Sequence, residues 1–272
     1  PPELGGVNRL GPQAGWGAGI VAATQEALRP YAGRADFTQF FPEAHLPAAL
    51  AALSPNSPVT VGCQGVYRDD VTPGGNFGAF TAGRPAAAMR ALGVQSALIG
   101  HCEERAALAG VLAEAGVTDA AAVNRILHRE MACALAQGLS VLYCVGEKAE
   151  EQAQWQQVLG QQLATGLEGL DTGRIVIAYE PVWSIGPGKT PADKAYITRI
   201  ARFIRAATGG MDVVYGGGLK QANAEMLASI AEISGGLIAL TRFTGEIGFY
   251  PDEYLEIIRL YLGETHEREG KR

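Results

Sequence analysis

Residues 174–190 read RIVIAYEPVWSIGPGKT, and they place one carboxylate at the end of an apolar run. Arg174–Tyr179 is apolar and β-branched, which is typical of a buried strand. Pro181 cannot donate to a strand ladder, so it ends the strand. Glu180 therefore lies at the carboxyl end of the predicted strand, which is the end that carries the chemistry in a parallel α/β barrel.

The loop after this strand has the composition of a lid. Trp183 and Ile185 place two bulky apolar side chains on it, and Gly186 and Gly188 bound its end. An apolar loop that ends in small residues suits a flap that closes over a ligand and excludes water. The segment therefore predicts a carboxylate base beneath a lid.

Short apolar runs alternate with helical patterns through most of the 272 residues. This alternation predicts βα units around a parallel sheet. The predicted strands are Phe37–Phe41, Val59–Gly62, Ser96–Gly100, Ser140–Val145, Arg174–Tyr179, Asp212–Tyr215 and Gly236–Leu240. The predicted helices are Gly17–Leu28, Ala44–Leu53, Ala86–Leu92, Ala120–Gln137, Glu147–Leu167, Ala192–Ala207, Gln221–Ile233 and Pro251–Leu262.

Seven strands leave a (β/α)8 barrel one strand short. The missing first strand would lie within Pro1–Leu10, where two Pro and two Gly weaken any strand. Alternatively, the true first strand is not part of this sequence. We predict α/β architecture with a single barrel domain over residues 1–262 and a charged, frayed tail over 263–272.

Composition excludes several classes of function. The formal net charge of -6 argues against nonspecific nucleic-acid binding, which needs a basic surface. Four scattered Cys show no metal-ligand spacing and are predicted to be reduced thiols of a cytoplasmic protein. No apolar run is long enough for a membrane span, and no cofactor motif is present. The run Glu147–Gln157 is predicted to be a solvated helix face.

Residues 178–190 resemble the catalytic strand and lid of the triosephosphate isomerase family. Four shorter segments match the same family in the same order, and the resemblance runs from about Phe37 to Leu262. These segments are GHCEER (Gly100–Arg105), GAFT (Gly78–Thr81), CVGE (Cys144–Glu147) and YGG (Tyr215–Gly217). The resemblance implies a TIM barrel without a cofactor or metal and with a small phosphorylated sugar as substrate.

The resemblance also implies roles for single residues. Glu180 matches the base that moves a proton between adjacent carbons, and His101 matches a neutral imidazole that polarises the carbonyl. Glu103 matches a buried carboxylate that organises the site. These types suit the chemistry, because burial under an apolar lid raises the pKa of a carboxylate and strengthens it as a base.

A second group of residues matches the residues with which the family binds its substrate. Gly186 matches a lid amide that binds the substrate phosphate, and Trp183, Ile185 and Gly188 belong to the lid itself. Tyr215 matches the residue that latches the closed lid.

The glycines after Tyr215 also match substrate-binding residues of the family. Gly216 and Gly217 lie where the backbone approaches the ligand closely, which Gly tolerates best.

The sequence departs from the family pattern at the first strand. The family carries Asn-x-Lys there, whereas this chain offers GGVNRLG, with Arg9 at the position of the Lys. Arg9 is predicted to supply the cation, although a planar guanidinium is not equivalent to a compact ammonium.

The segments that bind the substrate phosphate in the family, its phosphate cradle, also differ in this sequence. Gly218 stands in place of a Ser, and either Leu240-Thr241 or Thr241-Arg242 stands in place of Gly-Gly. Thr241 and Arg242 are predicted substrate ligands, with Arg242 offering a charge-assisted contact to an anion.

Two loops that meet across a dimer interface in the family are longer here. They are residues 64–78 and the stretch Ala106–Ala122 after His101. The family's acidic residue becomes Gly83 or Arg84, and its Arg becomes Glu104, which suggests a swapped charge pair. We predict a homodimer with a modified interface.

The leading hypothesis for function is an aldose–ketose isomerase that acts through an enediolate. The default substrates are D-glyceraldehyde 3-phosphate and dihydroxyacetone phosphate. The altered cradle leaves open another short ketose phosphate, such as a tetrulose phosphate. The missing Asn-x-Lys leaves open a barrel without catalytic activity that binds a metabolite or a protein.

Overall fold

The computed structural model describes residues 15–186 and 189–263. Within them, seven strands form one sheet in chain order, and every neighbouring pair is parallel. The strands are β1 Phe37–Phe41, β2 Val59–Cys63, β3 Ser96–Ile99, β4 Ser140–Val145, β5 Ile175–Tyr179, β6 Val213–Tyr215 and β7 Gly235–Gly236. This parallel order is the one that the βα alternation predicted.

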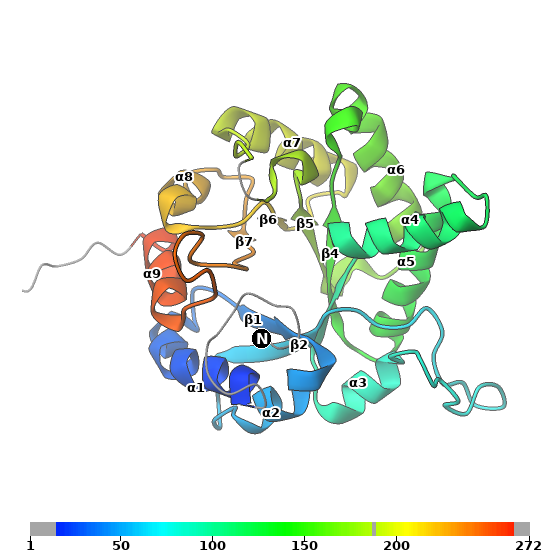
Figure 1. Cartoon of the computed structure of the whole chain (residues 1–272), viewed down its shortest axis with the longest axis horizontal. Coiled ribbons are helices and arrows are strands. Elements are labelled where there is room, and N and C mark those ends of the chain that lie inside the picture. Colours follow the sequence, from blue (N-terminus) through cyan, green and yellow to red (C-terminus); the bar gives the residue numbers. More distant parts are fainter. Residues whose placement is uncertain (1–14, 187–188, 264–272) are drawn as a thin grey trace, which may run out of the picture.

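Helices surround the sheet on its outer side (Figure 1). They are α1 Trp16–Leu28, α2 Leu46–Ala51, α3 Ala86–Leu92, α4 Cys102–Glu114, α5 Ala120–Ala136, α6 Trp155–Leu167, α7 Lys194–Ala207, α8 Ala224–Ala228 and α9 Pro251–Tyr261. α1 packs against both α2 and α9, so the helix ring continues past the gap between β7 and β1. The first strand predicted at Pro1–Leu10 lies outside the described residues.

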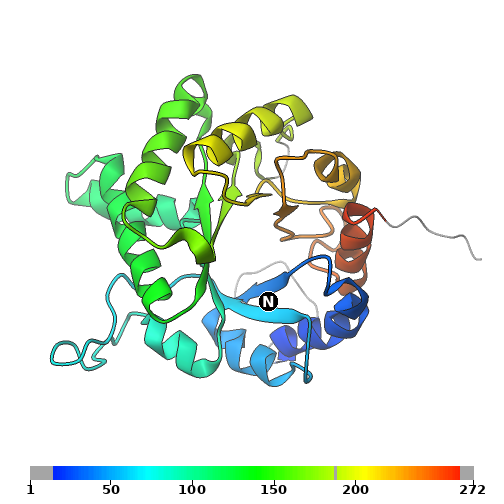
Figure 2. The ribbon, with the colours of Figure 1, turned by 180° about the vertical axis from the view of Figure 1, so that it is seen from behind.

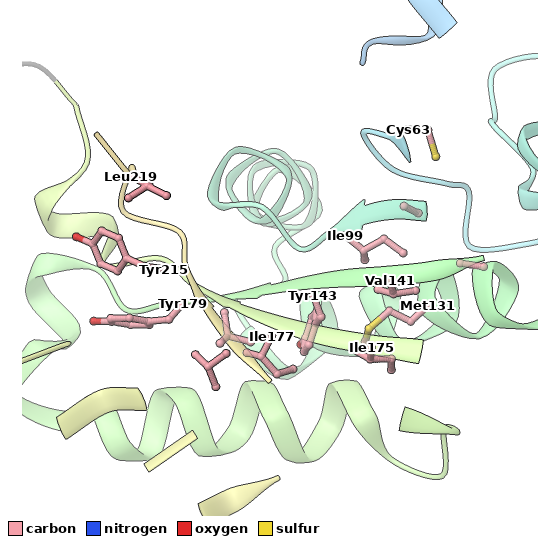
Figure 3. Close-up of a cluster of buried hydrophobic side chains, with 14 of the residues drawn as sticks. Cys63, Ile99, Met131, Val141, Tyr143, Ile175, Ile177, Tyr179, Tyr215 and Leu219 are labelled. Carbon is pink, nitrogen blue, oxygen red and sulfur yellow. The ribbon is translucent and has the colours of Figure 1, made fainter. Parts of the chain in front are cut away.

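The core lies between the sheet and the helices. Figure 3 shows Ile175, Ile177 and Tyr179 of β5 beside Tyr143 and Met131 in this layer. Strands β4 and β5 are buried over most of their length, as expected for a parallel sheet that is covered on both faces.

Two predicted elements are shorter than their patterns suggested. The strand predicted at Gly236–Leu240 is reduced to Gly235–Gly236, and the helix predicted at Gln221–Ile233 is regular only over Ala224–Ala228. The first turns before α2 and α6 are 3₁₀ rather than α-helical, at Glu43–His45 and Ala149–Gln154.

Helix α4 was not predicted, because its sequence was interpreted as part of a long loop. The helix spans thirteen residues, and none of them is buried. A helix without a buried stripe gives no clear 3.6-residue apolar period, so the pattern could not reveal it.

The connection from Gln64 to Pro85 projects beyond the ring of helices in both views of the molecule (Figures 1 and 2). It joins β2 to α3 and carries no helix or strand of its own. Among the described residues, no helix is long and apolar enough to cross a bilayer.

Candidate active site

The register of the sheet brings three strand ends to one level. Tyr179 of β5 pairs with Val145 of β4 and with Tyr215 of β6. Glu180 follows Tyr179 directly, and its amide donates to the carbonyl of Val145 at 2.8 Å. The predicted catalytic carboxylate therefore lies at the carboxyl end of the strands, where a parallel barrel places its chemistry.

Two glycines leave room for Glu180. A Cβ at Gly146 would lie 1.9 Å from the backbone oxygen of Glu180, and a Cβ at Gly216 would lie 2.7 Å from its Cγ. Both distances are below any real carbon contact, so these positions accept only glycine without a shift of the strands.

His101 and Glu180 meet, as the sequence predicted. His101 follows β3, and its Nε2 lies 3.1 Å from Oε1 of Glu180. The amide of Cys102, the first residue of α4, donates to Oε2 at 3.0 Å. Glu180 is only 2% exposed, whereas the side chain of His101 is 34% exposed and open to a ligand.

The two nitrogens of His101 have different partners. Nδ1 accepts from the amide of Glu103 at 3.4 Å, because His101 is the N-cap of α4. A neutral imidazole that accepts at Nδ1 carries its proton on Nε2. The N–H group therefore faces the side of the ring on which Glu180 lies, where it can donate to a substrate oxygen.

The pKa of Glu180 is raised to about 8 from an ordinary 4.5. Burial is the main cause, and the Cys102 amide and the charge of Arg105 oppose it in part. A carboxylate with a pKa near neutrality is a stronger base than an exposed one and is suited to proton transfer.

Arg105 anchors the turn that carries His101. Its guanidinium donates to the carbonyl of Gly100 and to that of Cys144, each at 2.8 Å, and to Asn124 at 2.8 Å. These bonds tie the start of α4 to the ends of β3 and β4. The position of His101 therefore depends on Arg105, which the sequence analysis quoted within GHCEER but did not single out.

The base of the lid is tied to a buried carboxylate, Glu147. Its Oε1 accepts from Nε1 of Trp183 at 2.8 Å, from the hydroxyl of Tyr179 at 2.9 Å and from that of Tyr196 at 2.8 Å. Burial, together with the bond to Glu147, raises the pKa of Tyr196 to about 12, so this phenol stays a donor.

The prediction that Glu147 belongs to a solvated helix face is wrong, because its side chain is fully buried. It follows the end of β4 by two residues, and its position at a strand end was the signal that the sequence contained. Nothing in the spacing pointed to Tyr196, which comes from α7.

The other lid residues lie as follows. Trp183 belongs to a 3₁₀ turn at Val182–Ser184, and Ile185 is half-buried. Gly186 is exposed with a φ of +111°, which is the left-handed region that favours glycine. Gly188 lies outside the described residues.

Tyr215 lies at the same end of the core as Tyr179 (Figure 3). Burial raises the pKa of Tyr215, and a hydrogen bond with Ser184 at the base of the lid opposes this in part. The latch role that the resemblance implied for Tyr215 stays a prediction, and the contact of Tyr215 in this structure is with Ser184.

The glycines that were predicted to bind substrate follow β6. Gly216 lies beside Glu180, and Gly217 is so close to the Tyr215 ring that a Cβ would meet its hydroxyl oxygen at 2.3 Å. Gly218 has a φ of +91°. The chain thus exposes a turn of bare backbone next to the base.

Arg242 is already paired. Its guanidinium donates to Glu253 at 2.6 and 2.9 Å and stacks on the ring of Tyr250 at 3.7 Å. Thr241 donates to the same Glu253 carboxylate at 2.8 Å. Both remain predicted substrate ligands, but an anion at Arg242 would face the negative charge of Glu253.

Two further predictions concern charges around His101. The resemblance implied a buried Glu103, and this is wrong, because its side chain is 90% exposed on the first turn of α4. Arg9, the predicted cation, lies outside the described residues.

A model of the triosephosphate isomerase family matches residues 17–258. Triosephosphate isomerase of Parasynechococcus marenigrum (strain WH8102) is 34% identical over 214 residues, which cover 77% of this chain and 78% of the relative. That of Pelodictyon phaeoclathratiforme (strain DSM 5477 / BU-1) is 36% identical over 196 residues, covering 68% and 70%. The crystal structure of triosephosphate isomerase from Bartonella henselae has a TM-score of 0.71 at 25% identity and covers 93% of this chain and 96% of that one.

Proposed function

Because the chain belongs to the triosephosphate isomerase family, we propose that it interconverts D-glyceraldehyde 3-phosphate and dihydroxyacetone phosphate. The observation that carries the proposal is the contact between Glu180 and His101 at the carboxyl ends of the strands, 3.1 Å from Oε1 to Nε2. The two groups provide the base and the hydrogen-bond donor of an enediolate mechanism within one substrate's reach.

In this mechanism Glu180 removes a proton from the carbon next to the carbonyl. The electron pair of the broken C–H bond forms the enediolate, and the N–H of His101 stabilises the developing charge on the carbonyl oxygen. The proton then returns from Glu180 to the neighbouring carbon, while His101 moves a proton between the two oxygens. No cofactor is needed, since the reaction is redox-neutral for the protein.

The lid supports this chemistry by keeping water out. Trp183 is fixed at its base by Glu147, so the rest of the loop moves against an anchored end. Bare amides at Gly186 and Gly216–Gly218 are the proposed phosphate ligands, with Thr241 and Arg242 beside them. Backbone amides bind an anion without a net positive surface.

A second substrate class has its own support. Gly218 and the Leu240–Arg242 stretch differ from the family's phosphate cradle, so a short ketose phosphate of different length, such as a tetrulose phosphate, is the alternative substrate. The chemistry at Glu180 and His101 would be the same.

The proposed homodimer rests on exposed apolar side chains. Among the described residues, Val71, Phe77, Val111 and Val117 are large, apolar and exposed, and all four lie in the two segments that are expected to meet across the interface. A cytoplasmic location is proposed as well, in keeping with four free cysteines.

The test is a coupled isomerase assay with glyceraldehyde 3-phosphate, dihydroxyacetone phosphate and a panel of tetrose and pentose phosphates. Glu180→Gln is expected to lower kcat on the preferred substrate by about 10²- to 10⁴-fold, the usual contribution of a positioned base. Glu150→Gln, an exposed carboxylate after β4, is the matched control and keeps wild-type activity. Wild-type protein that is inert on every substrate, like Glu180→Gln, would refute the proposal in favour of a barrel without catalysis.

A further inference from the structure

Three different metal-ligating side chains converge at the catalytic end of the barrel. Ligand atoms of His101, Cys102 and Glu180 all lie within 4.8 Å of one another. Nε2 of His101 is 3.1 Å from Oε1 of Glu180 and 4.0 Å from Sγ of Cys102. The sequence did not predict this set, because two adjacent residues and a third that is 78 positions away form no spacing motif.

The separations of 3.1 and 4.0 Å lie in the range found within one tetrahedral coordination sphere. Zinc binds His nitrogen and carboxylate oxygen at about 2.0–2.2 Å and thiolate sulfur at about 2.3 Å. Ligand atoms around one zinc ion therefore lie roughly 3–4 Å apart. The set as a whole spans up to 4.8 Å, so the side chains must rotate before all three atoms bind one ion.

A second observation also points to a cation. Oε1 of Glu180 is buried and has no hydrogen-bond partner among the described residues, since its contact with His101 lacks hydrogen-bond geometry. In its ionised form Glu180 would place charge on a buried oxygen without a donor, which is costly, and a bound cation would satisfy that oxygen.

We propose that His101, Cys102 and Glu180 form a binding site for a thiophilic divalent cation of the Zn²⁺ type, and that the bound cation blocks the active site. Thiolate and imidazole favour Zn²⁺ over Mg²⁺ or Ca²⁺. Three protein ligands leave the fourth position to water. The cation uses the lone pairs of the base and of the imidazole, so it competes with substrate.

The protons are accounted for as follows. Binding displaces to solvent the thiol proton of Cys102 and, where Glu180 is protonated, its carboxyl proton, and the metal–sulfur and metal–oxygen bonds form. The imidazole proton moves from Nε2 to Nδ1, which then gives up the hydrogen bond from the Glu103 amide and lies 3.9 Å from the Glu103 carboxylate. Thiolate and carboxylate neutralise the two charges of the ion, and Glu103 takes the orienting place that a carboxylate often holds behind a metal-bound histidine.

Cobalt titration of the chelator-treated full chain tests binding directly and without substrate. Wild type is expected to bind one equivalent of Co²⁺, with a thiolate-to-cobalt charge-transfer band and the intense visible bands of tetrahedral cobalt. Cys102→Ser is expected to lose the charge-transfer band, whereas Cys133→Ser, which alters a half-buried thiol on α5, keeps it.

Competition with a chromophoric chelator then gives the Zn²⁺ affinity. Cys102→Ser and Glu180→Gln are each expected to weaken it by at least about tenfold, and Glu103→Gln by about tenfold. Because two separate ligand variants are measured, misfolding of one variant cannot explain a loss of affinity in both. A wild type without the band, or Cys102→Ser that binds as tightly as wild type, would overturn the proposed site.

Inhibition is the part that rests on the proposed function. Zn²⁺ is expected to raise the apparent KM, with reversal by EDTA, and this effect should be at least about tenfold weaker in Cys102→Ser relative to its own uninhibited rate. Binding without catalysis in any assay leaves the metal site intact and refutes the proposed isomerase. Catalysis without binding refutes the metal site alone.

Discussion

A single carboxylate shows how burial can serve function at the expense of stability. Glu180 is 2% exposed and accepts one hydrogen bond through Oε2, from the Cys102 amide. Its pKa of about 8 lies well above the ordinary 4.5, so the folded protein favours the protonated form. Catalysis needs the ionised form, and the two demands conflict below pH 8.

The rate should follow the ionised fraction of Glu180. We expect kcat/KM of the wild type to rise about tenfold per pH unit up to about pH 8 and to level off above it. The measurement is an initial-rate profile at low substrate concentration. A profile that is flat between pH 6 and 9, in buffers that do not inhibit, would contradict the raised pKa.

The stability should change with pH in the opposite sense. The folded-state pKa of Glu180 is raised above its unfolded value. Its favourable contribution to the free energy of unfolding is therefore complete below pH 4.5 and is lost as pH rises through about 8. Glu180→Gln removes this loss. Its Tm is therefore expected to exceed that of wild type more at pH 9 than at pH 5, while Glu150→Gln shows the same difference at both. Equal Tm differences for Glu180→Gln at the two pH values would contradict a pH-dependent contribution of Glu180 to stability.

At the scale of elements, one buried carboxylate joins four segments. Glu147 follows β4, Tyr179 ends β5, Trp183 begins the lid, and Tyr196 lies on α7. The rings of Trp183 and Tyr196 also pack edge to face, with centroids 5.3 Å apart. The fixed end of the lid is thus held by hydrogen bonds and by packing together.

Tyr196→Phe separates these two effects. The ring contact with Trp183 remains, but Glu147 loses one of three donors, and we expect a loss of about 1 kcal/mol or more in the free energy of unfolding. Urea denaturation measures it. Tyr261→Phe is the matched control, because its hydroxyl makes only a long bond of 3.5 Å. A variant at Tyr196 as stable as this control would show that the third bond contributes nothing.

Sequence patterns predicted some elements better than others. The strand Phe37–Phe41 and the helix Ala86–Leu92 have the predicted bounds, because β-branched or aromatic runs and Pro or Gly punctuation mark them. Helix α4 was not predicted, because it has no buried apolar stripe. Strand β7 is shorter than predicted, because its paired residues are two glycines.

The candidate site divides in the same way. His101 and Glu180 could be predicted from motifs that end strands, since register then brings strand ends together. Tyr196 could not be predicted, because its role depends on how α7 packs against the lid, a long-range property that no local pattern contains. Cys102 was predicted only as one of four reduced thiols without metal-ligand spacing, and the turn at the N-terminus of α4 is what brings it to the base.

At the scale of the molecule, the exposed apolar side chains predict assembly. Phe77 is 90% exposed and Val111 is 72% exposed, on the projecting connection and on α4. Light scattering after size exclusion is expected to give twice the chain mass of 28.5 kDa. Phe77→Asp with Val111→Asp should yield monomers, because two buried charges oppose association.

The control for the interface is Ile247→Asp, an exposed apolar residue before α9. It should leave the dimer unchanged. A wild type that elutes with the mass of one chain at micromolar concentration would rule out the predicted assembly.

The glycines around Glu180 bear on how such a protein can evolve. A side chain at Gly146 would meet the backbone oxygen of Glu180 at 1.9 Å, and one at Gly216 would meet its Cγ at 2.7 Å, so either mutation would displace the catalytic base. At Gly218 the nearest obstacle is the flexible end of Lys220 at 3.4 Å, and the cost is backbone strain of roughly 1–2 kcal/mol. A lineage can therefore drift toward new sugar phosphates at one end of the site while it inherits the proton-transfer end unchanged.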